Sequence, residues 1–266
     1  MTLAVLVAAL IESAPPTGLS ARVAYVQDLD SGEVLYRRGG TSRHAIASIS
    51  KLMAMRVVLA RAPDLDATTE MLASDRENTR GGSRSRLLLG RHYTNRDLLH
   101  AALLGSDNRA VLALGRAVGL SRAAFTEAMN AEAAALGLKL HFGDPTGIDH
   151  ANAGTPEAVV GLLKAAADVP LLAAIARKPT YTTTSRGPGV RRITYVNTDA
   201  FAHGDRWDVI VGKTGFNSAA GWSVAVAVKL DGRRVGVVIL GSRSKVSRFG
   251  DARRVLAQVA RRGGQP

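Results

Sequence analysis

Ser48 and Lys51, three residues apart, are the first pair in this sequence whose types and spacing could perform nucleophilic chemistry. They open an apolar segment without Gly or Pro, residues 48–60, which predicts a helix buried on several sides. Residues three apart share one helix face, so the Ser48 hydroxyl and the Lys51 amine are expected to be neighbours. The free N–H groups of the helix start would also favour negative charge on a reacting oxygen there. A Ser-x-x-Lys pattern arises roughly once by chance in a chain of this length, so it needs support from other motifs.

A second polar cluster, Ser106-Asp107-Asn108, follows the apolar segment 98–104 and a break at Gly105. This position predicts a loop between two helices that presents three polar side chains. A helix cap is the competing interpretation, because Ser and Asp are favoured cap residues.

A third cluster, Lys213-Thr214-Gly215, ends a predicted strand that begins near Trp207. A lysine at a strand end is usually a solvated charge. Gly215 would, however, let a second backbone come close, as it must when an extended peptide adds itself to a sheet edge.

These three motifs occur in the order known from penicillin-binding proteins and class A β-lactamases. Each exact tripeptide is expected by chance in only a few per cent of such chains. On the motifs, and on the segments 45–53, 144–147 and 213–221, the chain resembles the low-molecular-mass penicillin-binding proteins of the D-alanyl-D-alanine carboxypeptidase and endopeptidase family. The likeness extends over residues 21–261 and points to the short periplasmic endopeptidases of that family, which lack an added C-terminal domain.

The resemblance implies a catalytic set of Ser48, Lys51 and Ser106. Ser48 would be the nucleophile, Lys51 the base that activates it, and Ser106 the relay that passes a proton to the leaving amine. A free lysine has a pKa near 10.4, so Lys51 must be desolvated or placed beside a second cation to be neutral near pH 7. Lys213 is the natural second cation.

The resemblance also implies a substrate-binding set of Asn108, Lys213, Thr214, Gly215 and Phe216. Asn108 would orient the catalytic lysine and the substrate amide, and Lys213 and Thr214 would hold a substrate carboxylate. The backbone N–H groups of Ser48 and Phe216 would form the oxyanion hole. No metal and no organic cofactor is required, and the six histidines show no zinc-binding pattern.

The elements that must position these residues alternate between strand and helix patterns. Residues 23–36 predict a hairpin, and caps at Thr94, Ser121 and Thr155 predict three helices. Apolar alternation returns over 209–211, 224–230 and 235–240, with a tight turn at Asp231-Gly232, before a last helix over about 246–261. The fold class is therefore α+β: a β-lactamase/DD-peptidase-like antiparallel sheet that mixes both chain ends, flanked by helices, with a mostly helical subdomain. Residues 1–20 are expected to be a leader or disordered segment, and 21–266 a single catalytic domain.

Composition narrows the partners. The 266 residues include no cysteine, which excludes disulfides, thiolate zinc sites and a cysteine nucleophile. The formal charge of +13 would attract polyanions, and the basic residues after position 242 are interpreted as a solvated helix face. No nucleic acid is expected, because aromatic residues are only 5% and none is interleaved with the basic positions in a known motif. The positive charge would also attract an anionic polymer of the cell envelope, which allows peripheral association with the envelope.

The expected function is cleavage of D-alanine-containing cross-links in peptidoglycan peptide stems through a Ser48 acyl-enzyme, with β-lactams as covalent inhibitors. Segments 83–89 and 178–197 resemble the loops of the endopeptidases, whereas a carboxypeptidase remains the alternative. A β-lactamase is disfavoured by the lack of Glu-x-x-Leu-Asn between the second and third motifs. A non-catalytic module that binds wall polymer or nucleic acid is the remaining alternative. The substrate implies a periplasmic location, although the apolar start, residues 1–11, lacks the preceding Lys or Arg of a complete export signal.

Overall fold

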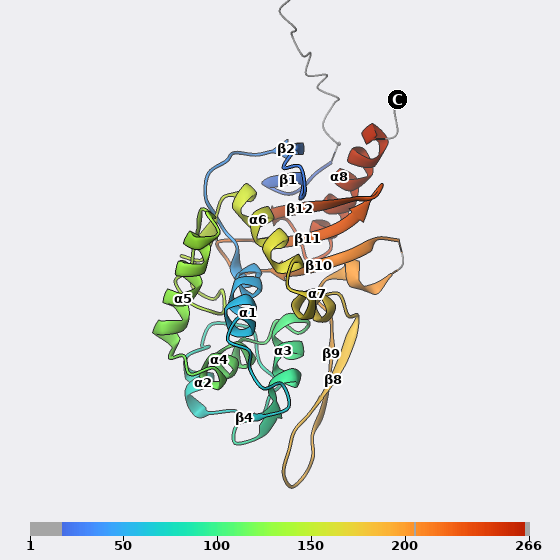
Figure 1. Cartoon of the computed structure of the whole chain (residues 1–266). Coiled ribbons are helices and arrows are strands. Elements are labelled where there is room, and N and C mark those ends of the chain that lie inside the picture. The colour runs from blue at the N-terminus through green and yellow to red at the C-terminus, as the bar shows by residue number, and fades with distance from the viewer. Residues whose placement is uncertain (1–17, 205, 264–266) are drawn as a thin grey trace, which may run out of the picture.

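The structure is a computed structural model that describes residues 18–204 and 206–263 (Figure 1). Most of the predicted leader, residues 1–17, lies outside the described residues. The central sheet is antiparallel, with strand order β10-β11-β12-β1-β2, so both ends of the chain contribute to it as predicted. Its strands are β1 (Val23–Asp28), β2 (Val34–Arg38), β10 (Asp208–Gly215), β11 (Trp222–Leu230) and β12 (Arg233–Ser242).

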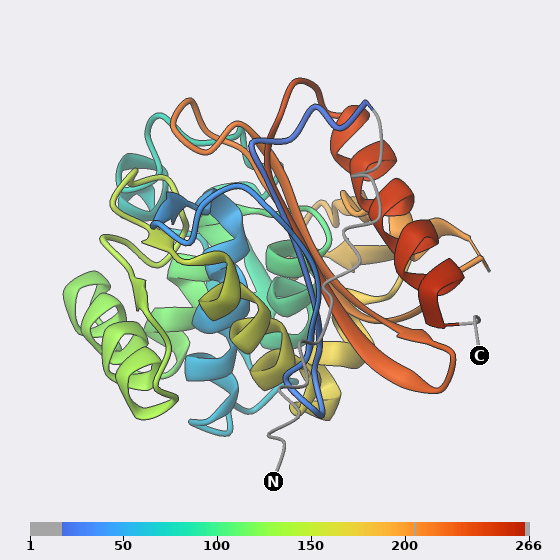
Figure 2. The same ribbon diagram turned by 90° about the horizontal axis from the view of Figure 1, so that it is seen from above.

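Alternation along β11 explains the two cores. Val224, Val226 and Val228 belong to the core beneath the C-terminal helix α8 (Ser247–Gly263), whereas Ala225 and Ala227 face the helical side. Figure 2 shows α8 alone on one face of the sheet and the remaining α-helices on the other.

The hairpin β11–β12 turns at Asp231 and Gly232. Both residues have positive φ, 50° and 76°. This is the geometry that an Asp-Gly turn between two strands adopts, so the predicted tight turn is confirmed.

Three helices on the other side of the sheet begin at the capping residues predicted for them. The side chains of Thr94, Ser121 and Thr155 accept backbone hydrogen bonds of 3.0–3.2 Å and start α3, α5 and α6. The α-helices of this side are α1 (Lys51–Leu59), α2 (Ala73–Glu77), α3 (Asn95–Leu103), α4 (Asn108–Ala117), α5 (Arg122–Ala135), α6 (Pro156–Ala167) and α7 (Pro170–Ala176). Among the described residues no single helix is long and apolar enough to cross a membrane, and only the sharply bent pair α6 and α7 meets that length and composition together.

Short strands and turns complete the fold. The hairpin of β8 and β9 projects from the body (Figure 1) and was not predicted. The threonine run of β8 shows no apolar alternation, although Ile193 and Tyr195 alternate with exposed residues in β9. The remaining elements are β3 (His44–Ala45), η1 (Ala47–Ser50), β4 (Thr68–Glu70), β5 (His92–Thr94), β6 (Leu140–His141), β7 (Ala153–Gly154), β8 (Thr180–Thr184), β9 (Arg192–Val196) and η2 (Ala200–His203).

Candidate active site

Ser48 lies in the 3₁₀ turn η1, and α1 begins only at Lys51, so the predicted helix starts three residues later than expected. Side chains three residues apart eclipse in a 3₁₀ turn, so Ser48 and Lys51 still share one face. Lys51 Nζ lies 2.8 Å from Ser48 Oγ. Ala47 enters the turn with a φ of 47°, an uncommon conformation for a residue with a side chain.

Lys51 is fully buried and has three polar neighbours. Besides Ser48 Oγ, its Nζ donates to Asn108 Oδ1 at 2.7 Å and to the backbone oxygen of Thr146. A neutral amine has two N–H groups and one lone pair. Asn108 Oδ1 and the Thr146 carbonyl can only accept, so a neutral Lys51 directs its lone pair at the Ser48 hydroxyl. This arrangement can remove a proton from Ser48.

Burial lowers the pKa of Lys51 to about 7, against weaker opposition from Asp144 and Asp107. Of the two expected causes, desolvation or a neighbouring cation such as Lys213, desolvation lowers this pKa. The influence runs the other way: burial, then the charges of Lys51 and Arg248, lower the pKa of Lys213 well below its ordinary value.

The Ser106-Asp107-Asn108 motif is only partly a loop. Asp107 caps α4, accepting from Arg109 N at 3.1 Å, and Asn108 is the first residue of that helix. The loop and cap interpretations therefore both apply, to different residues. Ser106 holds a φ of 55°, which turns its hydroxyl to Lys213 Nζ at 3.0 Å.

Lys213 ends β10 as predicted, but it is buried, with 1% of its surface exposed. Gly215 serves a different contact from the predicted one. A Cβ there would lie 2.6 Å from Ile46 O, so the glycine lets the chain's own backbone before Ser48 pack against β10. Among the strands that the structure describes, β10 lies at one edge of the central sheet, so this edge can receive an extended peptide.

The loop 144–147 provides one of the hydrogen-bond acceptors of Lys51. The Asp144 carboxylate accepts from the backbone N–H groups of Thr146, Gly147 and Asp149 at 3.0–3.1 Å. These bonds fix the Thr146 carbonyl that Lys51 contacts. In the sequence this segment contributes to the family likeness, but no role could be predicted for it.

Arg248 corrects the interpretation of the C-terminal basic residues as a uniformly solvated helix face. It is 3% exposed, and Nη1 donates to Gly215 O at 3.4 Å and to Ser223 O at 3.3 Å. Its buried Nε contacts no acceptor among the described residues. Burial lowers its pKa to about 10. Helical spacing alone could not reveal this, since a basic residue at this position in a helix looks like its solvated neighbours.

The predicted residues meet at one cleft of about 790 Å³, which Ser48, Ser106, Asn108, Thr214, Gly215 and Phe216 all line. Lys51 and Lys213 lie behind this lining and reach it through Ser48 and Ser106. Phe216 is 52% exposed and stacks on Trp222, with ring centroids 4.0 Å apart.

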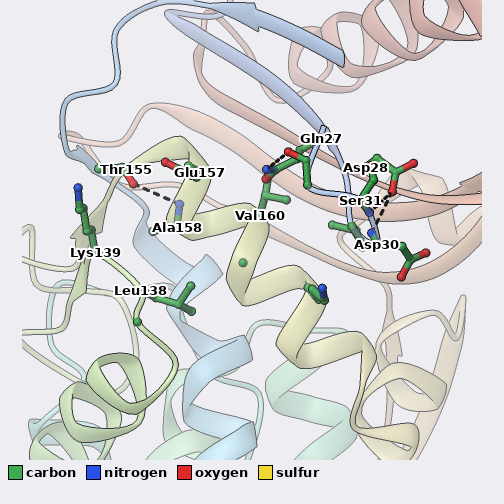
Figure 3. A pocket seen from close by; sticks show the side chains of 15 residues that line it. Gln27, Asp28, Asp30, Ser31, Leu138, Lys139, Thr155, Glu157, Ala158 and Val160 are labelled. Atoms are coloured by element: carbon green, nitrogen blue, oxygen red, sulfur yellow. Dashed lines mark hydrogen bonds between the residues drawn. The ribbon is translucent and has the colours of Figure 1, made fainter. Parts of the chain in front are cut away.

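Over the described ranges, no three His, Asp or Glu side chains gather in a way that could hold a metal ion. A second pocket, between α6, the turn after β1 and the loop before β6, shares no residue with the cleft (Figure 3).

Sequence comparison decides the family. Residues 9–244 match the model of the S11 peptidases, described as D-alanyl-D-alanine carboxypeptidase. The chain belongs to the S11 family of serine-type D-Ala-D-Ala peptidases.

Relatives within the S11 family carry both activities in their names. A D-alanyl-D-alanine endopeptidase of Pseudomonas aeruginosa is 34% identical over 89% of this chain and 76% of that protein. The corresponding endopeptidase of Escherichia coli is 31% identical over 87% and 74%. A D-alanyl-D-alanine carboxypeptidase of Mycobacterium tuberculosis is 32% identical over 83% and 74%.

Solved structures of similar enzymes confirm the predicted fold class. The Streptomyces K15 DD-transpeptidase superposes with a TM-score of 0.83 at 26% identity, covering 92% of this chain and 99% of the other. A D-alanyl-D-alanine carboxypeptidase of M. tuberculosis gives 0.81 at 29% identity, covering 95% of both.

Proposed function

We propose that this S11 peptidase is an endopeptidase that hydrolyses D-alanine-containing cross-links of peptidoglycan through an acyl-enzyme on Ser48. The observation that carries the chemistry is the set of three neighbours around Lys51 Nζ. Two of them can only accept a hydrogen bond, so the lone pair of a neutral amine is directed at the third, the Ser48 hydroxyl. The names of the endopeptidases at 34% and 31% identity support the choice of substrate.

In the first half-reaction, Ser48 Oγ attacks the carbonyl that follows a D-alanine, and its proton passes to Lys51. The backbone N–H groups of Ser48 and Phe216 would stabilise the oxyanion that forms. The C–N bond then breaks, and the leaving amine takes a proton from Ser106, which Lys213 Nζ contacts at 3.0 Å. The proton that Lys51 took from Ser48 replaces it on Ser106, so Lys51 is neutral again.

In the second half-reaction, water gives a proton to Lys51 as it attacks the ester carbonyl, the Ser48 ester bond breaks, and Ser48 Oγ takes that proton from Lys51. Asn108 would orient the substrate amide, and Lys213 and the Thr214 hydroxyl would bind a substrate carboxylate, with the Arg248 guanidinium supplying the positive charge. β-Lactams would acylate Ser48 and resist the second half. The substrate requires the enzyme to act where peptidoglycan lies, in the periplasm.

Covalent labelling by penicillin tests the nucleophile. Ser48→Ala should abolish labelling without changing the melting temperature appreciably. Ser50→Ala is the matched control, because that hydroxyl lies in the same turn but bonds to Ala47 O and to Asn152 Nδ2 at 2.9 Å. It should lose about 1–2 kcal/mol of stability and still label. Labelling of Ser48→Ala would reject the mechanism.

Product analysis tests the substrate. The purified protein is incubated with cross-linked muropeptide dimers and, separately, with a pentapeptide monomer. Monomers formed from dimers, without release of D-alanine from the pentapeptide, are expected. Release of D-alanine with intact dimers would instead favour the carboxypeptidase, which the M. tuberculosis relative makes the second candidate.

A further inference from the structure

Positive charge is concentrated in two segments beside the cleft. Residues 76–92 contain five arginines and one acid, and residues 177–192 contain four arginines, one lysine and no acid. Over the described part of the chain, none of these ten cations forms an ion pair. The cations of such a cluster repel one another, and together they present an uncompensated positive potential to solvent.

The two segments form one surface. Arg86 donates to Thr194 O at 2.9 Å, and its guanidinium lies 4.5 Å from the centre of the Tyr195 ring. Arg91 donates to the backbone oxygen of Pro188 near the tip of the β8–β9 hairpin. We name the exposed cations Arg84, Arg86, Arg186, Arg191 and Arg192 on this surface the basic rim.

The basic rim is anchored to the catalytic motif. Asp107 Oδ2 accepts from Ser85 Oγ at 2.7 Å, within the first segment, and from the Tyr195 hydroxyl at 3.0 Å, on β9 just after the second segment. The neighbours of Asp107 in sequence, Ser106 and Asn108, line the cleft, as do residues 81–83, which directly precede Arg84 of the rim. The rim therefore begins on the side of the cleft where Ser106 lies.

We propose that the basic rim binds the acidic peptide stem that supplies the leaving amine of the cross-link, an inference that rests on the proposed endopeptidase function. Ser106 is the group placed to protonate that amine, so the departing stem must lie beside Ser106 and against the rim. Free carboxylates on this stem would meet the arginines within about 8 Å, the distance over which charges interact at physiological salt. A carboxypeptidase substrate, which loses only D-alanine, has no second stem to place there.

A single-stranded nucleic acid fits the same surface less well. Base stacking needs exposed aromatic faces. The Tyr195 ring is 2% exposed and covered by Arg86, and Tyr181 stacks on His100 with ring centroids 3.5 Å apart. The rim offers charge without a stacking platform, which suits an acidic peptide.

The test compares two triple variants of the full chain. Arg84→Gln/Arg191→Gln/Arg192→Gln neutralises exposed rim cations that do not line the cleft. Arg37→Gln/Lys139→Gln/Lys164→Gln removes the same charge from other parts of the surface, and Lys139 and Lys164 line the separate pocket of Figure 3. The substrates are a muropeptide dimer, the same dimer with the carboxylates of the leaving stem amidated, and penicillin.

The rim variant should cut the acidic dimer with a kcat/KM about tenfold lower than wild type, and the difference should shrink at about 0.5 M salt. It should match wild type on the amidated dimer and in penicillin acylation, and the control variant should stay within about twofold of wild type with all three substrates.

Equal cleavage of the acidic dimer by the rim variant and wild type overturns the proposal, as does an equal loss on the amidated dimer. Loss of oligonucleotide binding with unchanged dimer cleavage also overturns it, in favour of nucleic acid. If the wild type labels with penicillin but cuts only pentapeptide, the proposed endopeptidase function itself has failed, which is a separate result.

Discussion

Lys51 Nζ donates to Asn108 Oδ1 across 2.7 Å, although the two residues are 57 positions apart in the chain. The contact joins the first and second motifs and fixes the direction of the amine. It also makes the protonation state of Lys51 sensitive to the chemistry of the residue at position 108.

Asn108→Asp should raise the pKa of Lys51, because a carboxylate would replace a neutral oxygen 2.7 Å from Nζ. The amine would then stay protonated at pH 7, and penicillin acylation there should fall by at least about tenfold while its pH midpoint moves upward by about one to three units. Asn108→Ala is the control: it removes the hydrogen bond and slows acylation without an upward shift. An unchanged midpoint in Asn108→Asp would show that this contact does not tune the base.

The pH dependence of acylation follows from the buried amine. Because the pKa of Lys51 is lowered to about 7, its neutral, proton-accepting form grows as the pH rises through that value. The rate constant for penicillin acylation should therefore rise through about pH 7 and level off above it. Lys51→Arg, which keeps its proton at all these values, should be inactive across the range. A rate that falls as the pH rises through 7 would contradict a neutral Lys51 as base.

The rate of penicillin acylation should depend on the backbone N–H of Phe216 and only slightly on its ring. The side chain is half exposed at the cleft edge, so Phe216→Ala should retain acylation within a few fold. Phe216→Pro removes the N–H proposed for the oxyanion hole and should slow acylation by about 100- to 1,000-fold. Stopped-flow acylation of both variants measures this, with circular dichroism to confirm that each is folded. Similar rates in the two variants would remove Phe216 from the oxyanion hole.

Gly147 should not tolerate a larger residue, because it lies against the turn that contains Ser48. Its φ is 84°, and an added Cβ would clash with Ala47 O and lie 2.7 Å from Ser48 N. Gly147→Ala should lose several kcal/mol of stability and most acylation. Gly119 has a similar φ of 75°, but a Cβ added there would meet no atom within 4 Å, so Gly119→Ala should cost only about 1 kcal/mol and keep full acylation. Urea unfolding gives both values, and equal losses would mean that the clash at Ser48 is unimportant.

Local patterns were sufficient wherever a residue's partners lie nearby in the chain. Thr94 caps α3 because its acceptor oxygen meets the N–H three residues later, and the valines of β11 face one core because side chains alternate in a strand. The same reasoning located Ser48 beside Lys51, since a spacing of three places both on one face even in the 3₁₀ turn that replaces the expected α-helical start.

Local patterns failed where burial decides the chemistry. Arg248 looks like Arg253, Arg254 and Arg261 in sequence, yet those three are exposed. Packing against β10 and β11 buries Arg248, which becomes a cation of the cleft. Asp199 is a second example: it caps η2, and burial against Gly212 raises its pKa to about 6 beside Lys213 and Arg248. Desolvation depends on the atoms that surround a group, and these come from elements far away in the chain.

The amino-acid sequence by itself determined the three motifs, most cap and strand positions, and the membership in a serine peptidase family that those motifs indicate. Only the tertiary structure decided that burial, not Lys213, lowers the pKa of Lys51, that Gly215 accommodates the backbone before Ser48, and that two distant segments meet at Asp107 to form the basic rim. Motifs and caps depend on contacts within a few residues, whereas burial and long-range pairing depend on how the whole chain packs.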